Sequence, residues 1–239
     1  MISIKYLMKR VFPNNVISWL GNINNKYFDG YALKSYSQEG EDMILRRLFD
    51  NQKTGFYVDV GAHHPKRFSN TYYFYKRGWK GINIDAMPGS MKLFNRVRPN
   101  DINIEKAISD RKEVLTYHMF KDPAVNTFNK KLSEESVLIN KRSIITELEI
   151  EAVPLKNILD KYLPPNQAID FISIDVEGLD IKVLNSNDWH KYRPRIVLVE
   201  DLDLTLSDLV SNDIYKFLSS INYKLIAKTV NTLIYETEF

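Results

Sequence analysis

The stretch Gly55-Phe-Tyr-Val-Asp-Val-Gly-Ala-His-His-Pro65 decides the class of fold. Its apolar start predicts a short buried strand of a parallel sheet. Gly61 then permits a tight turn and a close approach of the backbone to a ligand. A second apolar run, Gly81-Ile-Asn-Ile-Asp85, ends in an acid placed to accept hydrogen bonds from the hydroxyls of a ribose. Together the two stretches predict a cofactor that contains a nucleoside, bound to a doubly wound sheet.

Strands and helices alternate along the rest of the chain, which predicts an α/β fold with a largely parallel sheet. Further strands are expected at 102–108, 114–120, 149–153, 169–175 and 195–201. Helices are expected at 37–51 (with Ser37 as N-cap), 68–77, 88–97, 154–162, 179–186 and 207–219. Residues 223–235 then predict a closing antiparallel hairpin.

The chain of 239 residues fits one domain with an added segment. We expect an N-terminal helical extension over 1–34 and a ligand-binding domain over 35–239. The polar segment 121–148 is interpreted as a substrate loop, a mobile lid or a solvated surface loop. The start of the extension is amphipathic, so it either packs on the domain, which we favour, or attaches to a membrane surface. No transmembrane segment is expected, and we predict a cytoplasmic protein.

Net charge and amino-acid composition exclude several classes of binding partner and of chemistry. There are 33 basic and 30 acidic residues, and this balance argues against a nucleic-acid binder. The lack of cysteine excludes disulfides, thiolate metal sites and cysteine nucleophiles. A small-molecule partner is therefore expected, and a homo-oligomer is left open.

Acidic residues end several of the predicted strands, namely Asp59, Asp85, Asp175, Glu200 and Asp201. Carboxylates gathered at one sheet edge repel each other unless a cation or ligand compensates them. The first turn has neither a Walker loop nor the spaced glycines of a dinucleotide site, and Pro65 lacks a backbone donor. An acid in this position suits S-adenosylmethionine, which carries a sulfonium, an amino acid and a ribose.

Five motifs together resemble the FkbM family of S-adenosylmethionine-dependent methyltransferases: Tyr36-Ser-Gln-Glu-Gly-Glu-Asp42, Val58-Asp-Val-Gly-Ala-His-His-Pro65, Ser69-Asn-Thr71, Gly78-Trp-Lys-Gly-Ile-Asn-Ile-Asp85 and Ile174-Asp-Val-Glu-Gly178. They occur in a consistent order between about residues 35 and 205. The resemblance implies a Rossmann-like class I fold, with a mostly parallel seven-stranded sheet and a terminal antiparallel hairpin. It also implies O-methylation, commonly of sugars or natural-product hydroxyls.

The resemblance also implies roles for individual residues. Asp59 and Gly61 would hold the methionine end of the cofactor, and Asp85 with Ala86 the ribose. The remaining expected cofactor residues are Gln38 and Glu39, which would close the site, Asn70 and Thr71 beside it, and Ser109 and Asp110 near adenine.

Catalysis requires a group that assists the acceptor hydroxyl, because a sugar hydroxyl is a weak acid. Asp175 is expected nearest the transferring methyl, with His64 and Glu177 as further candidates for the base. Asp175, Glu200 and Asp201 could hold a hard cation such as Mg²⁺, or the last two could be ordinary ion-paired acids.

The predicted function is O-methylation of a sugar hydroxyl, with S-adenosylhomocysteine as product. The sugar would be nucleotide-linked or part of a surface polysaccharide such as capsule or lipopolysaccharide. Three alternatives stay open: a small metabolite or lipid as acceptor, a nucleotide-binding oxidoreductase, and a non-catalytic binding module.

Overall fold

The computed structural model describes residues 11–202 and 204–238. Contacts divide the chain into two units, with the boundary between Ser35 and Tyr36. In the first unit, helix α2 (Asn14–Tyr27) starts after Pro13, and none of its side chains is buried. Residues 1–10 of the predicted extension lie outside the described residues, and the packing of this arm stays a prediction. No helix in the described part of the chain is long and apolar enough to span a membrane.

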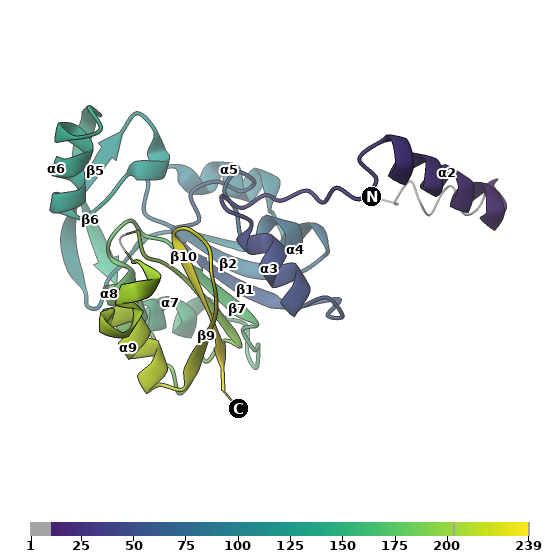
Figure 1. The fold of residues 1–239 in the computed structure, drawn as a ribbon. Helices are drawn as coiled ribbons and strands as arrows, with labels where there is room; N and C mark the ends of the chain where they lie inside the picture. The colour runs from purple at the N-terminus through teal and green to yellow at the C-terminus, as the bar shows by residue number, and fades with distance from the viewer. Residues whose placement is uncertain (1–10, 203, 239) are drawn as a thin grey trace. The chain divides into compact units, whose positions relative to one another are not determined.

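A seven-stranded sheet forms the centre of the second unit (Figure 1). Its strands are β1 (Phe56–Val60), β2 (Lys80–Asp85), β3 (Ile102–Glu105), β7 (Phe171–Ile174), β8 (Ile196–Glu200), β9 (Tyr223–Lys228) and β10 (Thr232–Thr237). Their order is β3-β2-β1-β7-β8-β10-β9. Strand β10 runs antiparallel to both of its neighbours, and the other pairs are parallel. The predicted Rossmann-like sheet with its terminal hairpin is thus confirmed.

Helices cover both faces of this sheet (Figure 1). The alternating side chains of Phe56, Val58 and Val60 pack in one core with α7 (Leu155–Tyr162), α8 (Asp180–Asn185) and α9 (Asp213–Ser220). Tyr57 faces the other way and joins a smaller core with α3 (Glu41–Leu48) and α4 (Tyr72–Lys76). Helix α5 (Ser90–Val97) lies between β2 and β3 in the chain, and a 3₁₀ turn (Leu206–Ser211) precedes α9. Because both faces are covered, functional side chains must lie at the strand ends.

A second sheet in the order β4-β6-β5 changes two expectations. The strand predicted over 102–108 divides into β3 and β4 (Ala107–Ile108), and β4 leaves the main sheet to pair with β6 (Ile144–Val153). Strand β5 (Glu113–Phe120) pairs antiparallel with β6, which starts five residues earlier than the predicted 149–153. That start was missed because residues 144–149 are exposed and carry no buried apolar pattern.

Segment 121–148 is folded rather than an irregular loop. It contains the 3₁₀ turn η1 (Pro123–Val125), helix α6 (Lys130–Leu138) and the start of β6. The Asn129 side chain caps α6 by accepting hydrogen bonds from the backbone N–H groups of Lys131 and Leu132.

The predicted N-cap of helix α3 is also wrong. The helix starts at Glu41, after Gly40 in the left-handed conformation. The Ser37 hydroxyl still accepts a hydrogen bond from the Asp42 N–H.

Candidate active site

A pocket opens beyond the carboxyl ends of β1, β2 and β7, where ligands of parallel sheets bind. Side chains of the main sheet line one part of it, and side chains of the second sheet and of η1 line another. The lining includes Gln38, Gly61, His63, Asp85, Ala86, Met87, Lys106, Ile108, Tyr117, Asn126, Phe128, Asp175, Val176 and Glu177. The pocket therefore contains several, but not all, of the residues selected from the sequence.

Gly61 lines the pocket just after the end of β1. Its φ is +83°, and an added Cβ would lie 1.6 Å from the Asp175 carbonyl oxygen. Its N–H donates to the Ile84 carbonyl at 2.9 Å, so the turn is attached to β2 as well. A side chain here would separate the ends of β1 and β7, which explains the glycine.

Asp85 ends β2 and is almost fully buried, with 8% of its surface exposed. One carboxylate oxygen accepts from the His63 N–H at 2.8 Å, and the other accepts from the Met87 N–H at 2.8 Å. Burial raises the pKa of Asp85, and these two amides act in the opposite direction. Each oxygen keeps a further lone pair for a ligand hydroxyl.

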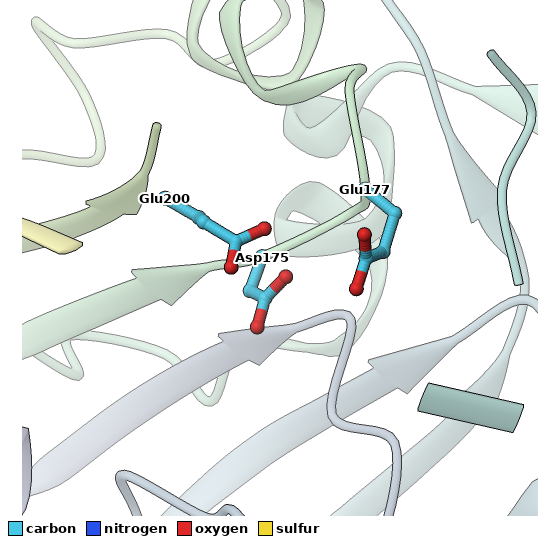
Figure 2. A group of neighbouring side chains, drawn as sticks. All are labelled: Asp175, Glu177 and Glu200. Carbon is cyan, nitrogen blue, oxygen red and sulfur yellow. The ribbon is translucent and has the colours of Figure 1, made fainter. Parts of the chain in front are cut away.

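Three carboxylates meet at the ends of β7 and β8 (Figure 2). Asp175, Glu177 and Glu200 offer oxygens that all lie within 4.8 Å of one another. Burial, together with the charge of Asp175, raises the pKa values of Glu177 and Glu200. This group can therefore retain a proton near neutral pH or bind a hard cation through oxygen ligands.

The third member of the acid group differs from the predicted set. Asp201 was expected beside Asp175 and Glu200, yet its carboxylate accepts from the Asn212 side-chain amide at 2.6 Å. Glu177 takes that place because the chain turns sharply after β7, where Glu177 has a φ of +52°.

Two contacts hold that turn, and sequence reasoning missed both. The Asp180 carboxylate accepts from the N–H groups of Val176 and Gly178, each at 3.1 Å. The Thr127 hydroxyl donates to the Glu177 carbonyl at 2.6 Å, which attaches the segment before α6 to the acid group. Burial, with the charge of Asp175, raises the pKa of Asp180 to about 7.

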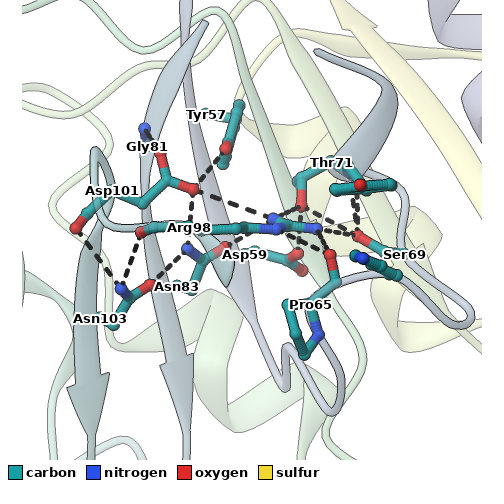
Figure 3. Close-up of polar contacts among 12 residues, drawn as sticks. Tyr57, Asp59, Pro65, Ser69, Thr71, Gly81, Asn83, Arg98, Asp101 and Asn103 are labelled. Atoms are coloured by element: carbon teal, nitrogen blue, oxygen red, sulfur yellow. Dashed lines mark hydrogen bonds and ion pairs between the residues drawn. The ribbon is translucent and has the colours of Figure 1, made fainter. Parts of the chain in front are cut away.

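A buried arginine holds the loop after the first turn in place (Figure 3). Arg98 is fully buried. Its Nε and Nη2 atoms donate to the Pro65 carbonyl at 2.8 and 2.6 Å, and Nη2 also donates to the Ser69 hydroxyl at 2.7 Å. Its Nη1 atom donates to Thr71 Oγ1 at 2.7 Å and lies 3.9 Å from Asp101. No periodicity or motif in the sequence marked this residue.

Several predicted residues belong to this supporting framework and do not line the pocket. Asp59 is buried within β1 and accepts from the Thr71 hydroxyl at 2.7 Å, and burial raises its pKa to about 6. Asn70 donates to the Ser173 hydroxyl at 3.0 Å, between the loop and β7. The direct contact of Asp59 with the cofactor is thus not supported by its position.

The remaining predicted residues divide in the same way. Gln38 lines the pocket, whereas the Glu39 carboxylate accepts from the Asn231 N–H at the β9–β10 turn. Ser109 donates to Glu113 at 2.6 Å, and neither it nor Asp110 lines the pocket. His63 lines the pocket, while Nδ1 of His64 accepts from the N–H groups of Lys66 and Arg67. Nδ1 of His64 therefore caps this turn, and a role of His64 as a base stays a prediction.

Comparison with known proteins decides the family. Residues 59–225 match the methyltransferase FkbM domain. This span includes β2, β3, β7 and β8 in full, the end of β1 and the first half of β9, and it ends before β10. The chain belongs to the FkbM methyltransferase family. The chain is thus an S-adenosylmethionine-dependent methyltransferase.

The solved structures to which this FkbM protein is similar are distant from it in sequence. A TehB-like S-adenosylmethionine-dependent methyltransferase from Corynebacterium glutamicum is 9% identical, with 94% of this chain and 97% of that chain covered and a TM-score of 0.42. An O-methyltransferase from Bacillus cereus in complex with S-adenosylhomocysteine is 10% identical, with 97% and 94% covered and a TM-score of 0.39. A putative O-methyltransferase from Klebsiella pneumoniae is 12% identical, with 98% and 95% covered and a TM-score of 0.38. Comparison with curated proteins gives no significant match.

Proposed function

We propose that this FkbM protein transfers the methyl group of S-adenosylmethionine to a hydroxyl oxygen of a sugar. The observation that carries the proposal is the group of three carboxylates beside the pocket. Methyl transfer from a sulfonium is an in-line displacement, so the acceptor oxygen must be held about 3 Å from the methyl carbon. A carboxylate near that oxygen can take its proton as the new C–O bond forms and the C–S bond breaks.

Each end of the cofactor has candidate partners in the pocket. Asp85, with Ala86 beside it, would accept hydrogen bonds from the ribose hydroxyls through the free lone pairs of its carboxylate. Gly61 and Gln38 would contact the methionine end, and Asp175 would lie nearest the transferring methyl. Asp59, Asn70, Thr71 and Arg98 would act by holding the loop that shapes this end.

A divalent cation is part of the proposal as an alternative to a retained proton. Asp175, Glu177 and Glu200 form an all-oxygen donor set, which suits a hard ion such as Mg²⁺. When bound, the ion would lower the pKa of a coordinated acceptor hydroxyl. Without it, the same carboxylates would serve directly as the general base.

The acceptor would enter from a second pocket on the β8 side of the acid group. Glu200 lines this pocket, together with polar side chains suited to hydroxyl groups: Asn129, Lys131, Asp180, Asp201, Asn212 and Asp213. Acids outnumber bases there, and Lys131 is paired with Glu135 at 3.7 Å. The pocket thus favours an uncharged sugar, such as one within a surface polysaccharide, over an anionic nucleotide-linked sugar.

The decisive experiment incubates the full chain with methyl-labelled S-adenosylmethionine, polysaccharide fragments and nucleotide sugars, with and without EDTA. Labelled polysaccharide product is expected. Loss of turnover in EDTA that Mg²⁺ restores would support a role for the cation in catalysis. Unchanged turnover in EDTA would exclude that role. Asp175→Asn should bind S-adenosylhomocysteine normally and lose turnover. If a lipid or a small metabolite is methylated and no sugar is, the proposal of a sugar acceptor is wrong.

A further inference from the structure

Helix α2 of the first unit is amphipathic, and none of its side chains is buried. Five of its apolar side chains follow the spacing i, i+3, i+4, i+7 and i+11, which places them on one side of the helix. The opposite side carries mostly asparagines. A helix of 14 residues with this pattern is only marginally stable in water, so its apolar side needs a surface to pack against. The five residues are Val16, Trp19, Leu20, Ile23 and Tyr27.

Exposed apolar residues also precede and follow α2 in the chain. Together with two exposed residues of the helix they form a set of seven, and each is between 44% and 79% exposed. Five of the seven are aromatic. Aromatic residues, Trp and Tyr above all, concentrate at the boundary between lipid headgroups and acyl chains, because their rings are apolar and their polar atoms stay in contact with water. The set consists of Val11, Phe12, Trp19, Tyr27, Phe28, Tyr31 and Leu33.

The N-terminal arm, residues 1–34, also carries the positive charge of the chain. It contains five basic residues and one acidic residue, Asp29, and therefore has a net charge of +4. The whole chain has a net charge of +3, so residues 35–239 together have a net charge of −1. Three of the basic residues lie outside the described residues, but their charge does not depend on their conformation. The basic residues are Lys5, Lys9, Arg10, Lys26 and Lys34.

This charge selects the surface that covers the apolar side of the arm. A second copy of the chain would bring two arms of charge +4 together, and like charges repel. The second unit has a net charge near zero and offers no comparable attraction. A bilayer that contains anionic phospholipids attracts basic residues to its surface and accepts apolar side chains between its headgroups. The arm is complementary to such a surface in both respects.

The length of α2 determines how the helix would meet a bilayer. A helix needs about 20 residues to cross the hydrocarbon core. With 14 residues and one polar side, α2 is suited to lie in the plane of the interface instead.

We propose that residues 11–33 form an interfacial anchor that binds the surface of an anionic phospholipid membrane. The apolar side of α2 and the flanking aromatic residues enter the headgroup region, and the basic residues of the arm face the lipid phosphates. The anchor holds the methyltransferase at a membrane surface. This proposal does not depend on the acceptor of the methyl group.

Vesicle flotation of the full chain tests the proposal. The protein should float with vesicles that contain phosphatidylglycerol beside phosphatidylcholine, and its binding to phosphatidylcholine alone should be at least about 10-fold weaker. Added salt should weaken binding to the anionic vesicles. Tryptophan emission gives a second measurement. Because Trp79 and Trp189 are buried, a shift to shorter wavelength on addition of vesicles reports on Trp19, and the shift should be absent in Trp19→Phe.

Paired variants locate the binding surface. Trp19→Ser with Phe28→Ser removes two exposed rings of the arm, and the affinity for anionic vesicles should fall about 10-fold or more. Leu206→Ser with Val210→Ser is the matched control, since these residues are 73% and 75% exposed but belong to the second unit. The control should bind like the wild type, and thermal unfolding checks that each variant is folded.

A second pair of variants tests the charge. Lys9→Glu with Arg10→Glu should weaken binding to anionic vesicles by about 10-fold or more. Lys53→Glu with Lys224→Glu makes the same change of charge at two exposed residues of the second unit. This control should retain most of the affinity of the wild type.

Several results would overturn the anchor. The wild type could fail to float with either kind of vesicle, or the arm variants could bind as well as the wild type. A dimer in light scattering that Trp19→Ser with Phe28→Ser dissociates, without vesicle binding, would show that a second copy covers the arm. Trp19 emission typical of a buried indole, unchanged by vesicles, would show that the arm packs on its own second unit.

Discussion

Replacement of Arg98 by methionine should destabilise the protein strongly, because the side chain is both charged and fully buried. Methionine retains much of the length and apolar volume of the arginine stem but removes every N–H donor. The Pro65 carbonyl would lose both of its bonds to the guanidinium, and the Asp101 carboxylate would lose its cation. Removing one partner of such a buried pair typically costs about 3–5 kcal/mol. That loss is a large share of the roughly 5–15 kcal/mol by which a folded domain is stable.

Urea unfolding measures this loss as a fall in the midpoint concentration, expected to be about 1 M or more. Arg96→Met is the matched control, since Arg96 is an exposed residue in the last turn of α5, two positions before Arg98. Its free energy of unfolding should change by no more than about 0.5 kcal/mol. Arg98→Lys should be intermediate, because it keeps the charge but cannot make the forked contacts. A loss below about 1 kcal/mol in Arg98→Met would refute the view that this residue holds the loop after the first turn.

Three further outcomes are expected. Asp85→Ala should abolish binding of S-adenosylhomocysteine in calorimetry while thermal unfolding still shows a folded protein, and normal affinity would exclude Asp85 as the ribose partner. Gly61→Ala should lose about 1–3 kcal/mol to backbone strain alone, with more from the contact of its Cβ with the Asp175 carbonyl, and a wild-type urea midpoint would contradict the geometry of the turn. Because folding raises the pKa values of Glu177 and Glu200, the contribution of these two groups to stability is greatest below the ordinary carboxyl pKa and is lost as pH rises from there toward the raised values. Glu200→Gln removes one of these titrating acids. In EDTA, its free energy of unfolding should therefore fall less than that of the wild type between about pH 5 and about pH 9. An equal fall in both proteins would show that repulsion among the acids does not destabilise the fold.

Much of the main sheet could be predicted from short apolar runs, because a strand covered on both faces must be apolar along its length. Five strands of this kind and the closing hairpin were expected near their observed positions. The second sheet could not be assembled in this way. Its strand β6 is exposed over residues 144–149, so hydrogen bonding to β5 and not burial decides its start.

The residues of the candidate site also separate into those that the sequence predicted and those that only the structure revealed. Asp85, Asp175 and Glu200 could be selected because they directly follow or end apolar runs, and the carboxyl ends of parallel strands share one edge. Glu177 was selected as a candidate base, but its place beside Asp175 and Glu200 could not be predicted, and Asp180 and Arg98 could not be assigned at all. Their positions depend on sharp turns and on partners distant in the chain, such as Thr127 for the Glu177 turn and Pro65 for Arg98.

The sequence by itself determined the type of sheet, the family and the acidic residues that end the strands, since all three follow from local patterns and from motifs in a fixed order. The tertiary structure alone decided which polar side chains face the pocket and which support it. Asp59 and Glu177 illustrate the difference. The first is directed into a buried network with Thr71, and the second is turned toward Asp175 and Glu200 by a left-handed backbone. The physical reason is that the role of a side chain depends on its neighbours in space, and local sequence patterns do not predict which distant segments of the chain come into contact.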